Sequence, residues 1–260
     1  MRNGGTPGAP GNRLVRVLPD AQLVAAAAAE LFVERAADAQ ARRGVFTVAL
    51  SGGSTPRLFH ALLATSPLRE KVDWSRIQFF WGDERCVPPD DPQSNYLMAR
   101  QTLLDFVPAP DDRIHRMRGE DDPASAAAAY EAEIWRVFGG PSTQTPVFDL
   151  IYAGMGPDGH TLSLFPHTVA LTVTDRLVSA NHVPQMNTNR ITFTTTLANN
   201  AALVAFVVSG GDKAAALAQV LDGLPNADLY PSQLITPSGE LLYLLDEAAA
   251  AQLSPLSRGE

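Results

Sequence analysis

The chain has a single cysteine, Cys86, among its 260 residues. One cysteine excludes a disulfide bond within the chain and any metal site built from several cysteines. Proteins without disulfide bonds suit a reducing compartment, so we expect a cytoplasmic location.

Long hydrophobic runs are also missing, and none approaches the roughly 20 apolar residues that a membrane helix needs. Residues 1–11 are rich in glycine and proline and lack the apolar segment of a secretory signal. We therefore expect no membrane partner, a disordered N-terminal extension over residues 1–12, and one α/β domain over residues 13–260.

Positive charge is in the minority, with 20 Lys and Arg residues against 28 Asp and Glu residues and a formal net charge of −8. Nucleic-acid-binding proteins usually carry basic faces, so we expect no nucleic-acid partner. An anionic substrate would have to be held by a few cations near the site. This is feasible because salt screens charges that are more than about 8 Å apart.

Short apolar runs alternate along the chain with longer helical patterns. The first helix shows the signals well: Pro19-Asp20 begins it, an alanine run sustains it and Gly44 ends it. The apolar runs are hydrophobic throughout, which predicts a buried, mostly parallel sheet in an α/β fold. We expect helices over 19–43, 56–63, 94–104, 123–138 and 212–221, and strands over 45–50, 77–81, 148–153, 191–195, 202–208 and 241–245.

A glycine-rich turn, Ser51–Pro56, follows the first of these strands and reads Ser-Gly-Gly-Ser-Thr-Pro. We expect a hydroxyl residue at the N-cap of the next helix and proline at its first position. Such a turn offers backbone N–H groups and the positive end of a helix dipole, which together bind phosphate. The motif lacks the features of the common nucleotide loops, so an ordinary strand-to-helix turn stays an alternative.

A second glycine-rich segment, Gly154–Pro166, follows the strand expected over 148–153 and contains Asp158 and His160. In open α/β sheets, chemistry takes place outside the carboxyl ends of the strands. The near-neutral pKa of histidine makes His160 the natural general base, and Asp158 is placed to orient the substrate or the loop. A metal site would need further nitrogen or sulfur ligands, so we expect none.

Charged residues lie at the ends of other expected strands. Gly82-Asp83-Glu84-Arg85 follows the strand over 77–81, and Arg190 directly precedes the one over 191–195. Lys213 follows a second glycine pair after the strand over 202–208. These positions predict acids and cations on one rim of the sheet, although solvated surface charges would give the same pattern.

Together these segments resemble the 6-phosphogluconolactonase family. The resemblance implies a single-domain, Rossmann-like α/β fold, with a mostly parallel sheet flanked by helices on both faces, which glucosamine-6-phosphate deaminases share. It also implies hydrolysis of 6-phospho-D-glucono-1,5-lactone to 6-phospho-D-gluconate in the oxidative pentose phosphate pathway, with no metal or organic cofactor. The matching segments are Ser51–Pro56, Gly82–Val87, Ser94-Asn95, Gly154–Pro166, Arg190-Ile191-Thr192 and Ser209–Lys213.

The resemblance also implies roles for individual residues. His160 matches the histidine that activates water, Arg190 the arginine that holds substrate and histidine, and Asp158 an acidic pocket residue. The implied partner is a small phosphorylated sugar lactone, bound by a monomer or a small homo-oligomer. The segment His182–Asn187 departs from the Lys-Pro-Pro-like run of many members. The implied substrate-binding residues are Gly52, Gly53, Ser54, Asp83, Arg85, which contacts an anion, and Lys213, near the phosphate.

Two other functions stay as alternatives. A glucosamine-6-phosphate deaminase or isomerase would carry an Asn-Glu pair before the proline that ends the histidine loop, Gly154–Pro166. This chain has Leu164 and Phe165 there. A non-catalytic sugar-phosphate sensor would carry a DNA-binding helix-turn-helix, for which residues 1–12 are too few. The missing glutamate and the presence of His160 favour a lactone-hydrolysing enzyme.

Overall fold

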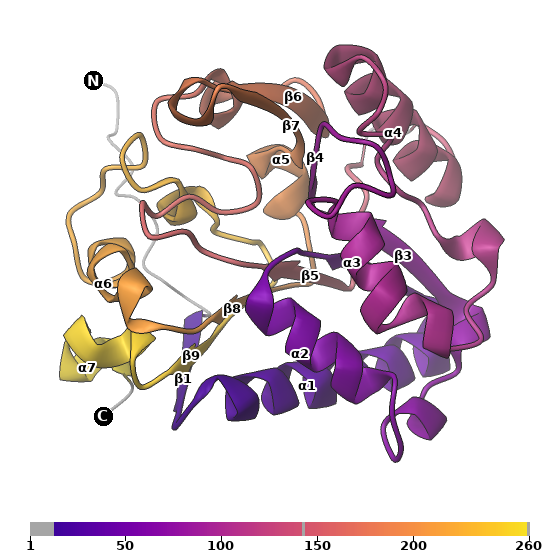
Figure 1. The fold of residues 1–260 in the computed structure, drawn as a ribbon, viewed down its shortest axis with the longest axis horizontal. Helices are drawn as coiled ribbons and strands as arrows, with labels where there is room; N and C mark the ends of the chain where they lie inside the picture. Colours follow the sequence, from indigo (N-terminus) through magenta and orange to yellow (C-terminus); the bar gives the residue numbers. More distant parts are fainter. Residues whose placement is uncertain (1–12, 142–143, 259–260) are drawn as a thin grey trace, which may run out of the picture.

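The structure is a computed structural model that describes residues 13–141 and 144–258. Figure 1 shows its central sheet, with helices below and a smaller sheet above. The disordered extension expected over residues 1–12 lies outside the described residues. One domain over residues 13–260 remains a prediction.

Six parallel strands form the central sheet in the order β1-β9-β8-β5-β2-β3. This confirms the expected α/β fold with a mostly parallel sheet. Strand β1 was not predicted, because its side chains alternate between half-buried and exposed rather than forming an apolar run. The strands are β1 Arg13–Leu18, β2 Phe46–Leu50, β3 Ile77–Trp81, β5 Leu150–Ala153, β8 Leu203–Val208 and β9 Glu240–Asp246.

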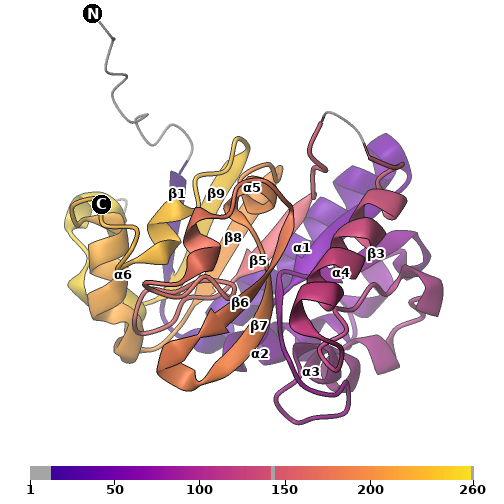
Figure 2. The ribbon, with the colours of Figure 1, turned by 90° about the horizontal axis from the view of Figure 1, so that it is seen from above.

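Helices cover both faces of this sheet (Figures 1 and 2). Residues of α1, α2 and α3 share one apolar core with one face, and residues of α4 and α6 share a second core with the other. Burying a large apolar side chain contributes roughly 1.5–3 kcal/mol, so the two cores account for much of the stability. The helices are α1 Ala21–Arg43, α2 Ser54–Leu63, α3 Asn95–Thr102, α4 Pro123–Val137, α5 Thr195–Ala198, α6 Ala214–Leu221 and α7 Pro255–Arg258.

A second sheet of three antiparallel strands lies above the central one (Figure 1). It has the order β4-β7-β6, with β4 Asp83–Arg85, β6 Val178–Val183 and β7 Thr188–Phe193. The strand expected over 191–195 is thus β7, and it lies outside the parallel sheet. Strands β4 and β6 were not predicted, because they carry charged and polar residues rather than an apolar run.

Turn residues explain where α1 begins and ends and where α2 begins. Asp20 caps α1 by accepting a hydrogen bond from the backbone N–H of Leu23 at 2.9 Å, and Gly44 ends it with a left-handed φ of 76°. The N-cap expected for the next helix is wrong, because α2 begins earlier, at Ser54. Its N-cap is Gly53, with a φ of 114° and no side-chain cap. A conformation that favours glycine therefore replaces a hydroxyl cap.

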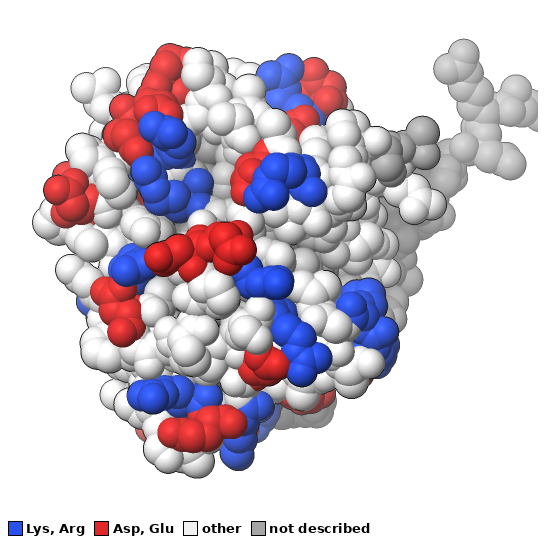
Figure 3. All heavy atoms as spheres, turned by 90° about the vertical axis from the view of Figure 1, so that its right-hand side faces the viewer, with Lys and Arg blue, Asp and Glu red and all other residues white. Residues whose placement is uncertain are grey.

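Short 3₁₀ helices make up several of the connections: Arg69–Lys71, Trp74–Arg76, Leu104–Phe106, Asp111–Arg113, Val169–Thr172, Pro184–Met186, Gly211–Lys213, Pro231–Leu234 and Ala249–Gln252. Among the described helices, none is long and apolar enough to cross a membrane. Figure 3 shows acidic and basic side chains interspersed on the face that it presents. On that face, neither acidic nor basic side chains gather in one place.

Candidate active site

A pocket of about 310 Å³ opens at the carboxyl edge of the central sheet. The chain passes from β2 to β3 on one side, whereas β5, β8 and β9 lie on the other side of β2. Ligands of open α/β sheets bind at such a reversal of strand order. The residues that line the pocket are Ser51, Gly52, Gly53, Asp83, Arg85, Asn95, Gly154, Met155, Gly156, His160, Leu162, Ser163, Phe165, Met186 and Arg190.

The fold brings most of the predicted site residues to this pocket. Three of them are not among its lining residues: Ser54, Asp158 and Lys213. Ser54 is exposed in the first turn of α2, and Asp158 contacts the pocket through His160. The predicted residues that line the pocket are Gly52, Gly53, Asp83, Arg85, His160 and Arg190.

His160 and Asp158 form a close pair. The Nδ1 atom of His160 lies 2.6 Å from Oδ1 of Asp158, and the backbone N–H of His160 donates to the same oxygen at 3.2 Å. Burial raises the pKa of Asp158, but the hydrogen bonds and charge of His160 outweigh this, so the pKa lies below its ordinary value. An ionised carboxylate at Nδ1 holds the proton there, which leaves Nε2 of the neutral ring as the basic nitrogen.

Phe165 packs against one face of the His160 imidazole. Its ring stacks on His160 with centroids 4.0 Å apart and an interplanar angle of 24°. Phe165 is largely buried and Leu164 is fully buried. The two positions at which the family resemblance implies an amide and a carboxylate in a deaminase therefore carry buried apolar side chains here.

Gly156 lies against the same imidazole ring. A Cβ atom at this position would be 2.2 Å from Cε1 and Nδ1 of His160. The backbone N–H of Gly156 donates to the carbonyl of His160 at 2.9 Å. The ring thus lies directly over the backbone, which is the reason that this loop position requires glycine.

Two arginines line the pocket from the small sheet. Arg85 on β4 pairs in register with Arg190 on β7. The guanidinium of Arg190 is buried, and it donates to Thr188 Oγ1 at 2.8 Å and to the carbonyl of Asn189 at 3.0 Å. Burial and the charge of Arg85 both lower the pKa of Arg190. A bound anion would relieve this repulsion between like charges.

Lys213 lies one strand further along the same edge, after β8. Its ammonium forms an ion pair with Asp212. In the glycine pair before Lys213, the backbone N–H of Gly210 also has a partner within the protein, because it donates to the Asp246 carboxylate at 3.0 Å. The role predicted for Lys213 near a phosphate therefore remains a prediction.

A buried polar network connects β4, α3 and the histidine loop. Ser163 Oγ donates to Oδ2 of Asp83 at 2.6 Å, and Asn95 Nδ2 donates to the carbonyl of Asp83 at 2.9 Å. The neighbouring Glu84 carboxylate accepts from the backbone N–H groups of Arg85, Asn95 and Tyr96, each at 2.8 Å. Burial raises the pKa of Glu84, and these N–H groups oppose the rise.

The side chain of Asn95 also explains one of the two glycines in the turn after β2. A Cβ atom on Gly52 would lie 1.8 Å from Oδ1 of Asn95. The turn and the N-terminus of α3 are therefore in direct contact, and Gly52 is the residue that permits the approach.

Nine of the lining residues were not predicted as site residues: the glycine and apolar positions Gly154, Met155, Gly156, Leu162 and Phe165, and also Ser51, Asn95, Ser163 and Met186. Of the last four, Ser51, Asn95 and Ser163 lie in segments that carry the family resemblance. Met186 lies in the segment that departs from the family pattern, so nothing in the sequence pointed to it. Hydroxyl and amide groups next to the predicted residues were the available signal for the other three.

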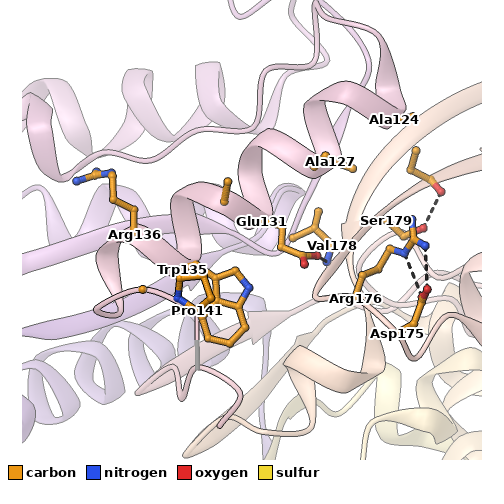
Figure 4. Close-up of a pocket in the computed structure, with 14 residues that line it drawn as sticks. Ala124, Ala127, Glu131, Trp135, Arg136, Pro141, Asp175, Arg176, Val178 and Ser179 are labelled. Atoms are coloured by element: carbon orange, nitrogen blue, oxygen red, sulfur yellow. Dashed lines mark hydrogen bonds and ion pairs between the residues drawn. The ribbon is translucent and has the colours of Figure 1, made fainter. Parts of the chain in front are cut away.

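A larger cavity, of about 720 Å³, lies between α4 and β6. Figure 4 shows Glu131 and Trp135 of α4 on one side, with Val178 beside Glu131. The charged groups of this cavity already have partners. Arg176 pairs with Asp175, Arg136 pairs with Glu133, and Glu131 accepts from the backbone N–H groups of Leu177 and Val178. Neither arginine of the smaller pocket forms an ion pair with a described residue, so this pocket is the better candidate for an anionic ligand.

Metal-ligating residues do not cluster in the described parts of the chain. No group of three or more His, Cys, Asp or Glu residues there is arranged to hold a metal ion. The absence of a metal and of an organic cofactor stays a prediction.

Comparisons with known proteins show similarity to one family. A family model described as "Glucosamine-6-phosphate isomerases/6-phosphogluconolactonase" matches residues 19–244. A 6-phosphogluconolactonase of Nostoc sp. is 45% identical over 245 residues, which cover 93% of this chain and 99% of that protein. One of Synechocystis sp. is 42% identical over 242 residues, with coverages of 93% and 98%. The solved 6-phosphogluconolactonase from Trypanosoma cruzi gives a TM-score of 0.82 at 28% identity, with coverages of 93% and 97%.

Proposed function

This chain belongs to the glucosamine-6-phosphate isomerase and 6-phosphogluconolactonase family, and from this premise we propose how it hydrolyses its lactone ester. The substrate is 6-phospho-D-glucono-1,5-lactone and the product is 6-phospho-D-gluconate, as in the pentose phosphate pathway. His160 acts as the general base on water, and Arg85 and Arg190 hold the phosphate. The observation that carries this proposal is the His160–Asp158 pair at a pocket that two arginines also line.

The first step is attack of water on the lactone carbonyl carbon. Nε2 of His160 removes a proton from the water as the new C–O bond forms, and the carbonyl π electrons move onto the oxygen. Asp158 stabilises the imidazolium that results, because its carboxylate accepts a hydrogen bond from Nδ1–H, with Nδ1 and Oδ1 2.6 Å apart. A positioned general base contributes typically 10²–10⁴ in rate.

The second step is collapse of the tetrahedral intermediate. The oxyanion re-forms the carbonyl, the bond to the ring oxygen breaks, and the imidazolium of His160 protonates that oxygen. The product is the open-chain carboxylic acid with a free hydroxyl group on C5, and the acid then ionises. His160 returns to the neutral state, so no other proton carrier is required.

The developing oxyanion needs hydrogen-bond donors. We assign this role to backbone N–H groups of the turn at Gly52 and Gly53, since both residues line the pocket and α2 has no side-chain cap. The uncapped first turn of a helix presents N–H groups and a positive dipole end to an anion. Donors fixed before the reaction stabilise the oxyanion without reorganisation.

The phosphate fits the pair of arginines on the small sheet. Arg85 and Arg190 are cross-strand neighbours, and the described residues include no ion-pair partner for either. Guanidinium groups bind phosphate through paired, charge-assisted hydrogen bonds. Binding at the phosphate, away from the reacting carbon, positions the lactone against His160.

A deaminase of the same family is the second candidate, and one observation decides against it. The side chains at positions 164 and 165 are leucine and phenylalanine, and Phe165 stacks on His160. A carboxylate that supports ring opening is therefore missing at the place where that chemistry would use it.

The test is hydrolysis of freshly prepared phospholactone by the purified protein, measured against an enzyme-free blank because the lactone also hydrolyses spontaneously. We expect a rate well above the blank, a fall of at least 10²-fold in kcat for His160→Ala, and poor turnover of unphosphorylated gluconolactone. A wild-type rate equal to the blank would overturn the function. An unchanged rate for His160→Ala would overturn the mechanism, and equal turnover of both lactones would remove the phosphate site.

A further inference from the structure

The carbonyl oxygen of Gly159, the residue just before His160, accepts two hydrogen bonds from one distant residue. The side-chain hydroxyl of Ser232 donates to it at 2.8 Å, and the backbone N–H of Ser232 donates at 3.0 Å. A carbonyl oxygen has two lone pairs, so these two donors satisfy it fully. Ser232 is fully buried and is not among the residues that line the pocket. Any influence of Ser232 on the reaction therefore passes through the histidine loop.

The Gly159 carbonyl belongs to the same peptide unit as the backbone N–H of His160. That N–H donates to Oδ1 of Asp158 at 3.2 Å, and the same oxygen lies 2.6 Å from Nδ1 of the His160 ring. The peptide unit is thus held at both of its polar groups, by Ser232 at the oxygen and by Asp158 at the nitrogen. Because a peptide unit is rigid and planar, these contacts fix the direction in which the chain enters His160.

The conformation of Gly159 makes an external restraint on this peptide unit necessary. Its φ is 78°, in the left-handed region, and glycine moves between backbone conformations at little cost. Within the loop, the N–H of Gly159 donates to the carbonyl of Gly156 at 3.0 Å, but the Gly159 carbonyl points out of the turn to Ser232. The loop alone therefore does not hold the carbonyl of Gly159.

Ser232 belongs to a segment that is attached to the core of the protein. It lies in the 3₁₀ helix Pro231–Leu234, and the carbonyl of Leu234 accepts from Nδ2 of Asn199 at 2.8 Å. Ile235 directly follows this helix and is buried in the apolar core to which α4 and α6 contribute. The two donors on Gly159 are thus held from outside the histidine loop by a fixed part of the fold.

We infer that Ser232 is a positioning residue whose hydroxyl group holds the peptide unit between Gly159 and His160 and so keeps the imidazole paired with Asp158. The inference rests on the proposed function, in which His160 is the general base. If this peptide unit turned, the backbone N–H of His160 would leave Asp158. The ring would then lose the carboxylate that holds its proton at Nδ1, and Nε2 would no longer be the basic nitrogen in every molecule.

Ser232→Ala removes one of the two donors and leaves the backbone N–H in place. We expect kcat for the phospholactone to fall about three- to tenfold, the contribution of one hydrogen bond between neutral groups. KM and the thermal protection given by the product, 6-phosphogluconate, should change little, because Ser232 does not line the pocket. Ser232→Thr keeps a hydroxyl group and should recover part of the lost kcat.

The protonation of the His160 ring is a readout that a general loss of stability would not change. ¹⁵N NMR of histidine-labelled protein distinguishes a neutral ring with its proton at Nδ1 from one with its proton at Nε2. We expect the Nδ1–H form in wild type and a mixture of both forms in Ser232→Ala. The signal that His160→Ala lacks identifies this residue among the five histidines.

Ser257→Ala is the matched control. Ser257 is also buried, at 6% exposure, and its Oγ donates to Oδ1 of Asp222 at 2.6 Å. It too is not one of the residues that line the pocket. We expect both alanine variants to lower the melting temperature, but only Ser232→Ala should change kcat and the His160 signal.

Two results would overturn the inference: a kcat of Ser232→Ala equal to that of wild type, or a fall in its kcat without a change in the His160 signal. The second result would mean that Ser232 does not act through the histidine. Failure of the proposed function has a different signature, because wild type itself would then not exceed the enzyme-free blank. The NMR measurement needs no substrate, so it tests the contact of Ser232 with the histidine loop in either case.

Discussion

At the scale of single residues, the orientation of the His160 imidazole depends on three neighbours of different kinds. Asp158 holds Nδ1, Phe165 stacks on the ring, and Gly156 leaves room for it. Each contact removes one freedom of the imidazole, so Nε2 is presented to the pocket in one orientation. In the proposed function, Phe165 also occupies the position at which a deaminase would carry a carboxylate.

Asp158→Asn should lower kcat at least tenfold with little change in KM. An asparagine amide keeps the shape of the side chain but does not stabilise the imidazolium formed when His160 takes a proton. Steady-state kinetics at neutral pH measure the effect. Asp228→Asn is the control, since Asp228 pairs with His167 at an exposed site outside the pocket. If both variants match wild type, Asp158 has no part in catalysis.

At the scale of elements, the site depends on where two helices begin. Gly53 starts α2 with a φ that favours glycine, so the first turn carries no side-chain cap. The Glu84 carboxylate gathers the first N–H groups of α3 and fixes that helix to β4. The two helix starts meet where Asn95 lies against Gly52.

Gly52→Ala should lower kcat/KM at least tenfold, because its Cβ would overlap Oδ1 of Asn95 and displace the turn after β2. Asn95→Ala in the same chain removes the overlapping atoms. We therefore expect the double variant to recover part of the activity that Gly52→Ala loses, relative to Asn95→Ala alone. Purely additive losses in this double-mutant cycle would show that the contact does not position the turn.

The sequence predicted most of the elements but not how they pair. Apolar runs and turn residues placed β2, β3, β5, β8 and β9, because strands buried on both faces are hydrophobic throughout. The edge strand β1 and the strands β4 and β6 lack that pattern. Their pairing comes from contacts distant in the sequence, which a local pattern does not contain.

At the scale of the whole molecule, two apolar cores share one sheet, and polar groups enclosed in them affect the pH dependence of folding. His60 of α2 is fully buried, with Nδ1 3.1 Å from Thr102 Oγ1 and no partner for Nε2 among the described residues. Burial, together with the charge of Arg57, lowers its pKa from 6.5 to about 3. The ring is therefore neutral in the folded protein at neutral pH.

Stability should fall as the pH is lowered from 6.5 towards 3. In this range the unfolded chain binds a proton at His60 and the folded chain does not, which costs about 1.4 kcal/mol per pH unit. Urea unfolding at several pH values measures the slope, and His60→Gln should reduce it. His182→Gln, at an exposed position, should leave it unchanged. Equal slopes for wild type and His60→Gln would contradict the assignment.

The cytoplasmic location, the oligomeric state and the absence of a nucleic-acid partner remain predictions from the sequence.

The two faces of the sheet pack against different elements. One packs against α1, α2 and α3, whereas the other carries the small antiparallel sheet that brings Arg85 and Arg190 to the pocket. The reversal of strand order beside β2 positions the pocket between these parts.

The sequence by itself determined the order of the main elements, the two glycine-rich turns and the likeness to a lactonase family. These properties depend on neighbouring residues, through apolar runs, turn chemistry and the short motif around His160. The tertiary structure alone decided which distant side chains meet. It placed Arg85 opposite Arg190 and Asn95 against Gly52. Those contacts join residues far apart in the chain, so packing and strand register determine them.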